Sequence, residues 1–432
     1  MNSSWHETDL AIGAQIAAEL FDVLAAKTTD PPGVTRKAYG NGERIAHELI
    51  SGVAAKAGAK AEYDAAGNLF LVMPGEDRSR EILVGSHVDT VPHGGNFDGA
   101  AGVIAGIAAQ AVFHAADRRP PFDLTVVALR AEESCWFPYS YVGSKTALGI
   151  LDPAVPDSVK RIDTGKTLAE HMREAGFDPD AVKGGAHRVN SKRTIAYIEP
   201  HIEQAPILVL DNLPVGVVTG IRGSFRYRQA KCIGAYAHSG AMPREYRKDA
   251  VMATSDLIQG MDRFWDGMEA KSADLTVTFG ELGTNPEHHG FSKVPGETHI
   301  CVDIRSQEQE TLSIAETRLH ELVADIEKKR GVRFELGERT GSKPALMSGH
   351  LQEMLHAAAK RIGIEARTMA SGAGHDASVF SLHGVPSAML FIRNTDGSHN
   401  PDEAMALADF NAALAVLVEM LSQPASAWPS TT

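Results

Sequence analysis

Apolar positions repeat with a helical period in two early segments of the chain, Leu10–Lys27 and Glu43–Ala57. Short apolar runs follow that end in small or polar residues, at Ile82–Ser86 and from Leu124 onward, and these are typical of buried strands. Between the two runs, residues 99–116 carry the small side chains of a closely packed helix. Because strands alternate with helices here, the pattern predicts a largely parallel sheet.

The middle of the chain has a different pattern. FRYRQAKCIGAYAHSG, LTVTFGELGT and THICVDIRS each alternate apolar and polar residues, as half-solvated antiparallel strands do. Helical periodicity separates these runs at Asp249–Met268 and Gln307–Arg330. Two helices on one antiparallel sheet predict a small α+β domain over residues 222–340.

The end of the chain returns to the alternating pattern of its beginning. A helix is predicted at His350–Ile362, a strand at SAMLFIR and a last helix from Ala404. The fold class we expect is therefore α/β. Residues 1–221 and 341–432 would form one discontinuous catalytic domain with a mainly parallel sheet, and 222–340 would be inserted into it.

Charge and cysteine content narrow the classes of function. The 432 residues include 42 basic and 55 acidic side chains, a net charge of -13, which argues against a nucleic-acid or anionic-membrane partner. A small anionic substrate stays compatible, because one or two arginines can hold it. The three cysteines form no CxxC pair, so neither a disulfide framework nor a thiolate zinc site is expected. The first residues lack a signal-peptide pattern, and we expect a cytoplasmic protein.

Metal-ligand residue types follow the predicted strands. His87 follows one strand, Asp98 precedes the small-residue helix, and Asp89 is placed to orient the imidazole of His87. Taken alone, such a pair is more often a surface histidine and a helix-capping aspartate. The adjacent acids Glu132 and Glu133 end the next strand, where one carboxylate can bind a metal while its neighbour acts as a general base.

Two further histidines make a metal site the better interpretation of these residues. His201 lies in HIEQ and His399 lies in DGSHNPDE, each just beyond a predicted strand. Ends of parallel strands meet at one sheet edge, so His87, Asp98, Glu133, His201 and His399 are expected to converge. Five such ligands with a shared aspartate suit two metals about 3.5–4 Å apart.

Other candidates lie outside this cluster. His238 in GAYAHSGAMP is either a turn residue or a group that polarises a carbonyl oxygen. Arg305 in CVDIRS is either a surface charge or a fork for a substrate carboxylate. The Gly-rich segment ASGAGHDAS, with Gly372 and Ala373, has no Walker lysine and no predicted strand directly before it. We therefore interpret it as a loop that brings backbone groups close to a substrate.

These motifs together resemble the di-metal amidohydrolases that include N-carbamoyl-L-amino-acid amidohydrolase, β-alanine synthase (β-ureidopropionase) and allantoate amidohydrolase, within the aminoacylase and dipeptidase superfamily. The resemblance extends from GVTRKAYGNGE near residue 33 to SHNPDE near residue 403, and HIEQ points to the carbamoyl/ureido branch. It implies that Asp98 bridges two divalent metals, zinc first, with manganese, cobalt or nickel as alternatives. His87 and His399 would complete one metal site, and Glu133 and His201 the other.

The resemblance also implies roles for the remaining residues. Glu132 would be the general base, Asp89 the partner of His87, and Gln204 a substrate-binding glutamine. Arg305 would bind the substrate carboxylate, and His238 would reach the partner's site in a homodimer. The inserted domain would be the lid and dimerisation domain. The sequence departs from the family in SCWFPYSY after Glu133, at Ala205 where glycine is common, and at Ser292, where relatives usually carry a substrate-binding asparagine.

The expected reaction is metal-dependent hydrolysis of a linear carbon–nitrogen bond. The first candidate substrate is an N-carbamoyl-L-amino acid, which would give the amino acid, ammonia and carbon dioxide. Allantoate and β-ureidopropionate are alternative ureido substrates, and an N-acyl amino acid or dipeptide would release no ammonia. A non-catalytic relative that binds a small carboxylate is the alternative from another class, although the retained Glu132 argues against it.

Overall fold

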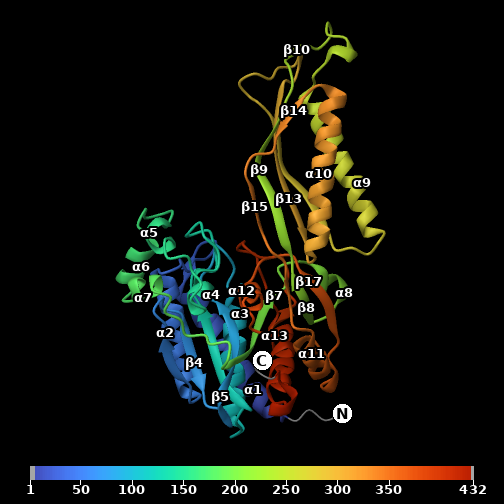
Figure 1. Ribbon diagram of the computed structural model, residues 1–432. Helices are drawn as coiled ribbons and strands as arrows, with labels where there is room; N and C mark the ends of the chain where they lie inside the picture. Colours follow the sequence, from blue (N-terminus) through green and yellow to red (C-terminus); the bar gives the residue numbers. More distant parts are fainter. Residues whose placement is uncertain (1–4, 430–432) are drawn as a thin grey trace. The chain divides into compact units, whose positions relative to one another are not determined.

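The computed structural model describes residues 5–429, which fall into two compact units (Figure 1). Unit 1 takes the chain up to Thr219 and again from Leu346 onward, and unit 2 is Gly220–Ala345. These limits lie close to the positions, 222 and 340, between which the sequence pattern places an inserted domain. Each unit has its own apolar core.

Unit 1 is built on a nine-stranded sheet with the order β16-β8-β18-β7-β5-β6-β4-β3, and β17 pairs with β8. Its central neighbours β18, β7, β5 and β6 are parallel, whereas β8 and β4 pair antiparallel with them. The expected α/β class with a mainly parallel central sheet is thus confirmed. The strands are β3 (Lys60–Tyr63), β4 (Leu69–Met73), β5 (Asp77–His87), β6 (Phe122–Leu129), β7 (Thr194–Ile202), β8 (Val215–Ile221), β16 (Ala345–Leu346), β17 (Ala366–Ser371) and β18 (Ser387–Ile392).

Helices cover the central strands, which is why these strands are apolar runs rather than alternating patterns. Every residue of β6, β7 and β18 is buried. Helix α3 (Ala100–Ala115) lies closest, because a Cβ at Gly102 would stand only 2.0 Å from the carbonyl oxygen of Pro200 on β7. The other long helices of unit 1 are α1 (Glu7–Lys27), α2 (Asn41–Lys56), α11 (Gly349–Arg361) and α13 (Leu407–Leu421).

Short elements complete unit 1, and most of them have no clear apolar period in the sequence. They are β1 (Thr29–Asp30), β2 (Gly33–Val34), α4 (Val142–Ala147), α5 (Val155–Ser158), α6 (Leu168–Glu174), α7 (Pro179–Lys183), α8 (Ile207–Asp211), α12 (Asp376–Leu382) and the 3-10 turn Ala425–Ala427. Strand β17 runs directly into the Gly-rich segment. The expectation that no strand directly precedes this segment is therefore wrong, because ARTMAS forms a strand beside β8 without a strong apolar pattern.

Unit 2 carries a five-stranded sheet of order β11-β13-β9-β14, with β15 also paired to β9, and these strands pair antiparallel. Two long helices lie side by side against this sheet (Figure 1). Strand β13 alternates between buried and half-buried residues, as expected for a sheet with one covered face. The elements are β9 (Gly223–Ile233), β10 (Ala237–His238), the 3-10 turn Arg244–Tyr246, α9 (Ala250–Glu269), β11 (Thr276–Thr284), β12 (Lys293–Val294), β13 (Glu297–Ser306), α10 (Gln309–Arg330), β14 (Arg333–Glu335) and β15 (Arg339–Ser342).

None of the helices within residues 5–429 combines the length and the apolar character needed to cross a membrane.

Candidate metal centre

The parallel strands of unit 1 deliver the candidate ligands to one edge of the sheet. His87 is the last residue of β5, and His201 is the second-to-last residue of the neighbouring strand β7. Glu133 follows β6 on one flank, and His399 follows β18 on the other. Asp98 lies in the loop between β5 and α3. The convergence predicted from the sequence therefore has its cause in the strand order β18-β7-β5-β6.

His87, Asp98 and His201 form the first ligand group. Oδ1 of Asp98 lies 3.5 Å from Nε2 of His87 and 3.3 Å from Nε2 of His201. Nδ1 of each ring faces a backbone carbonyl oxygen, that of Asp89 at 3.0 Å and that of Ile202 at 2.8 Å. A proton on Nδ1 serves those contacts and leaves both Nε2 atoms directed at the shared carboxylate.

Asp98, Glu133 and His399 form the second ligand group. Nε2 of His399 lies 3.5 Å from Oδ2 of Asp98 and 3.2 Å from Oε1 of Glu133. The His399 side chain is 51% exposed, whereas those of Asp98 and Glu133 are buried. The backbone of His399 has a φ of 61°, in the left-handed region that residues other than glycine seldom adopt.

The pairing of ligands implied by the family resemblance is wrong in this geometry. His87 groups with His201 rather than with His399, and Glu133 groups with His399 rather than with His201. The reason is the strand order, since β5 and β7 are central neighbours while Glu133 and His399 come from loops on the flanks. Asp98 belongs to both groups, as expected of a bridging carboxylate.

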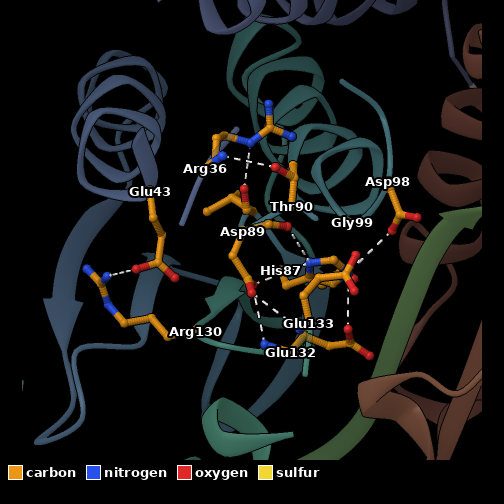
Figure 2. A network of polar contacts seen from close by, with 12 residues as sticks. Arg36, Glu43, His87, Asp89, Thr90, Asp98, Gly99, Arg130, Glu132 and Glu133 are labelled. Carbon is orange, nitrogen blue, oxygen red and sulfur yellow. Dashed lines mark hydrogen bonds and ion pairs between the residues drawn. The ribbon is translucent and has the colours of Figure 1, made fainter. Parts of the chain in front are cut away.

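Two local features hold this arrangement in place. Gly99 has a φ of 64°, and a Cβ there would stand 2.5 Å from the ring of His87, so only glycine allows the ring to lie against the loop. The Asp89 carboxylate accepts hydrogen bonds from the backbone N–H groups of Glu132 and Glu133, at 3.3 and 3.2 Å. Figure 2 shows the Asp89 side chain pointing toward these two residues.

Asp89 therefore has a second role besides the predicted contact with His87. Its carboxylate Oδ1 stands 3.5 Å from Nδ1 of His87, while its backbone carbonyl makes the shorter contact with that atom. The same residue thus orients the imidazole and fixes the turn that carries both acids. Arg130, just before this turn, pairs with Glu43 to one side of it (Figure 2).

Glu132 lies beside the first ligand group. Its Oε2 is 3.8 Å from Nε2 of His87, and its side chain is only 11% exposed. Burial raises the pKa of Glu132 well above its ordinary value, and the neighbouring carboxylates of Glu133, Asp376 and Asp89 add to the increase, against the lowering effect of His87. A buried carboxyl with a raised pKa next to candidate ligands is the pattern expected of a group that transfers protons.

Gln204 is also brought to the centre. Its Nε2 donates to Oδ2 of Asp98 at 2.8 Å and to the hydroxyl of Ser398 at 2.9 Å, and its backbone φ is 65°. Gly372 and Ala373 lie between β17 and α12, where Ser371 donates its hydroxyl proton to the Ala373 carbonyl at 2.8 Å. The Gly-rich segment therefore passes from the end of β17 through a short bend into α12.

His238, Ser292 and Arg305 belong to unit 2, whereas the ligand groups belong to unit 1. His238 is exposed on β10, where its Nδ1 accepts hydrogen bonds from the backbone N–H groups of Gly240 and Ala241. The carbonyl of Ser292 accepts a hydrogen bond from the N–H of Ser239 at 2.9 Å, so His238 and Ser292 are close neighbours.

Arg305 lies on β13 and pairs with a carboxylate of its own strand. Its Nη2 stands 2.9 Å from Oδ2 of Asp303, which also binds Arg226 on β9 at 3.0 Å. The two guanidinium groups hold the pKa of Asp303 below its ordinary value despite the opposing effect of its burial. Asp303 is a partner of Arg305 that sequence reasoning did not single out.

Glu199 and His375 are buried residues that sequence reasoning missed. Glu199 accepts hydrogen bonds from the Ser86 hydroxyl and from the N–H of Ala377, each at 2.7 Å, and so joins β5, β7 and α12 behind the ligands. The ring of His375 packs edge-on against His201 with centroids 4.5 Å apart. A signal for Glu199 existed in the sequence, since an acid two positions before His201 shares its strand face.

The donor set fits divalent metal ions. Each group offers imidazole nitrogens and carboxylate oxygens, with the three ligand atoms all within 4.8 Å of one another. Among the residues that the structure describes, the buried Oε1 of Glu133 has no polar partner besides the ring of His399, whose Nε2 lies 3.2 Å away. Nitrogen and oxygen donors of this kind suit zinc, manganese, cobalt or nickel.

Comparison with known proteins places the chain in a family. Residues 83–423 match the family described as Peptidase family M20/M25/M40. The chain is 33% identical over 374 residues to N-carbamoyl-L-amino acid amidohydrolase of Geobacillus stearothermophilus, covering 86% of this chain and 88% of that protein. It is 30% identical over 416 residues to allantoate amidohydrolase of Escherichia coli (strain K12), covering 95% and 97%.

A solved structure agrees in fold. The amidase of the hydantoinase/carbamoylase family from Burkholderia multivorans superposes with a TM-score of 0.86 at 27% identity, covering 95% of this chain and 98% of that one. These matches confirm the resemblance to the amidohydrolases. The family is typically dependent on two metal ions, which agrees with the two ligand groups. The chain belongs to Peptidase family M20/M25/M40, as a hydrolase of carbon–nitrogen bonds in non-peptide linkages.

Proposed function

We propose that the protein hydrolyses N-carbamoyl-L-amino acids to the free amino acid, ammonia and carbon dioxide. The observation that supports this is two ligand groups sharing Asp98, with the buried Glu132 beside them. The similarity to N-carbamoyl-L-amino acid amidohydrolase of Geobacillus stearothermophilus favours the carbamoyl group among the ureido compounds.

Two divalent ions, zinc first with manganese, cobalt or nickel as alternatives, would be held by the two groups. His87, Asp98 and His201 would hold one ion, and Asp98, Glu133 and His399 the other. When bound, the ions supply Lewis-acid polarisation of the substrate carbonyl and lower the pKa of a nearby water.

Glu132 would carry the protons of the reaction. Its Oε2 would accept a proton as water attacks the carbonyl carbon and would pass it to the leaving nitrogen. The raised pKa of the buried carboxyl suits it to hold that proton between the two events. Asp89 keeps Glu132 in place through the N–H group of that residue.

Recognition of the substrate would use both units. In unit 1, Gln204 and the backbone of Gly372 and Ala373 would line the pocket. In unit 2, Arg305 would bind the carboxylate, and His238 would stabilise the developing oxyanion in the partner's site of a homodimer. Ser292 would face the substrate where relatives usually carry asparagine. Unit 2 would be the lid and dimerisation domain, with domain limits at 222 and 340, whose closure excludes water.

The test is ammonia release by purified protein. Metal is removed and zinc, manganese, cobalt or nickel is restored singly, with N-carbamoyl-L-amino acids, β-ureidopropionate, allantoate and an N-acetyl amino acid offered in parallel. Metal-dependent ammonia from the N-carbamoyl-L-amino acids is the expected result. Free amine from the N-acetyl control, with no ammonia from any ureido compound, would instead indicate an N-acyl-amino-acid or dipeptide hydrolase.

Allantoate is the second candidate substrate. The specific observation in its favour is the match to 97% of the allantoate amidohydrolase of Escherichia coli. Turnover of allantoate well above that of every N-carbamoyl amino acid would replace the first proposal, and turnover of β-ureidopropionate alone would identify a β-ureidopropionase. Tight carboxylate binding without turnover in metal-replete protein would indicate a non-catalytic relative.

A further inference from the structure

The loop that carries Asp98 is fastened by an acid from the far end of the chain. Oε1 of Glu403 accepts hydrogen bonds from the backbone N–H groups of Phe97, at 2.8 Å, and of Asp98, at 3.1 Å. Glu403 is only 6% exposed. Its carboxylate therefore holds the peptide that positions the shared ligand, and it does so from outside the two ligand groups.

The Asp98 loop is shaped to accept this side chain. A Cβ at Gly95 would stand 2.2 Å from both Cδ and Oε1 of Glu403. Such a separation is far below any van der Waals contact, so Glu403 keeps its position only because residue 95 has no side chain. The close approach of Gly95 and the two backbone hydrogen bonds together fix the position of the Glu403 carboxylate.

Glu403 shares a closed loop with His399. The loop is pinned at its base, where Thr395 and Ala404 exchange two backbone hydrogen bonds of 2.8 and 3.2 Å. Inside it, the side-chain amide of Asn400 donates to the Asp396 carbonyl at 2.7 Å. Because this loop is closed, the bonds from Glu403 to the Asp98 loop also set the distance between Asp98 and His399.

The first ligand group has a separate attachment. Arg36 is fully buried, and its Nε donates to the Val88 carbonyl at 2.6 Å while its Nη1 donates to Oδ1 of Asn96 at 3.0 Å. Arg36 therefore ties the Asp98 loop to the residue that follows His87. Arg36, together with the N–H of Gly99 that donates to Nε2 of His201 at 3.2 Å, anchors the Asp98 loop toward the first ligand group, while Glu403 anchors it toward the second.

We propose that Glu403 is a positioning residue that aligns Asp98 with His399, so that its loss selectively weakens metal binding by the group Asp98–Glu133–His399. The proposal rests on the two-metal centre proposed above, and it does not depend on the identity of the substrate. The acting feature is an acceptor oxygen at the position of Oε1, because both hydrogen bonds end there.

The experiment compares zinc retention by five full-length proteins: the wild type, Glu403→Gln, Glu403→Met, Glu419→Met and Gly95→Ala. Glu403→Gln keeps an acceptor oxygen, whereas Glu403→Met keeps the length of the side chain without an acceptor. Glu419→Met is the matched control, because Glu419 on α13 is a 3% exposed glutamate of the same unit whose carboxylate binds Arg361 at 2.8 Å. Zinc per chain is measured during titration with a chelator, and the melting temperature is measured on metal-free protein.

We expect the wild type, Glu403→Gln and Glu419→Met to hold two zinc ions at chelator concentrations where Glu403→Met holds one. The affinity loss should be about 10–100-fold, the usual effect of removing an outer partner of a ligand. Metal-free Glu403→Met should melt no lower than metal-free Glu419→Met. Gly95→Ala, which displaces the Glu403 side chain from the opposite side, should reproduce the loss of one ion.

Three results would overturn the proposal while leaving the metal centre intact. Glu403→Met could keep both ions at the wild-type midpoint, or lose both at the same midpoint. Glu403→Gln could lose the second ion as readily as Glu403→Met, which would assign the effect to charge. A wild-type protein that holds fewer than two zinc ions would overturn the proposed centre itself, and this proposal with it.

Discussion

In unit 1 the central strands are buried on both faces, whereas in unit 2 the strand β13 alternates between buried and half-buried residues. The polar side chains of the two units differ in burial in the same way. His87, Asp98 and His201 are at most 4% exposed and contact one another. In unit 2, His238 is exposed, and Arg305 is half-buried against Asp303.

This difference in burial determines which kind of chemistry the polar groups of each unit can perform. Charges that face one another away from water interact strongly, and their pKa values shift, as for Glu132. Partly exposed charges exchange partners at low cost, which suits a group that must bind and release a substrate. We therefore expect changes at Glu132 and the buried ligands of unit 1 to affect turnover or metal binding, and changes at Arg305 of unit 2 to affect mainly KM.

The largest effect should come from Glu132→Gln in unit 1. The amide keeps the shape but cannot carry the proton, so kcat should fall about 10²–10⁴-fold, the usual contribution of general acid–base catalysis. KM and zinc content should change little. Near-wild-type kcat in folded, metal-loaded protein would remove Glu132 from the mechanism.

A smaller effect is expected from Arg305→Lys in unit 2. Lysine keeps the charge but loses the planar fork, so KM should rise about 10-fold with a lesser change in kcat. Arg226→Lys is the matched control, because Arg226 binds the same Asp303 at 3.0 Å from the neighbouring strand. Equal changes in both variants would mean that Arg305 acts through Asp303 and not on the substrate.

The smallest effect should be on stability, from His47→Gln in unit 1. Burial and the nearby Arg130 lower the pKa of His47 well below its ordinary value. The folded protein therefore keeps this ring neutral, while the unfolded chain takes up a proton below about pH 6.5. The contribution of the neutral His47 ring to the unfolding free energy is present above that pH. It is lost as the pH falls, by up to about 1.4 kcal/mol per pH unit.

Urea unfolding at pH 7.5 and pH 5.5 measures this contribution. The loss of stability on acidification should be smaller in His47→Gln than in the wild type, and a change at the exposed His187 should leave the loss unchanged. An identical loss in His47→Gln would show that the ring is protonated in the folded protein.

Much of the fold could be predicted from the sequence, because the apolar positions of its long helices and strands repeat with a clear period. The long helix α9, observed at Ala250–Glu269, is predicted at Asp249–Met268, and the predicted strands at His87 and before His399 are also found. Strand β17 was missed because ARTMAS has no continuous apolar run. Helices α4 to α7 were missed because each is only 4–7 residues long.

The members of the site were easier to predict than their arrangement. The polar residues that follow parallel strands all reach the same edge of the sheet, so the candidate ligands could be named from the sequence. Which histidine joins which carboxylate depends on β7 lying beside β5, and the sequence does not state that. Glu403 was missed because an acid on a polar loop has no pattern of its own.

The distribution of the ligands along the chain orders the assembly of the site during synthesis. Between His201 and His399 the ribosome adds 198 residues (399 minus 201), including all of unit 2. At about 5–20 residues per second this takes about 10–40 s. A nascent chain can therefore hold the whole first ligand group while the second still lacks its histidine. His399 then emerges four residues ahead of Glu403, so the last ligand and its anchor complete the centre together.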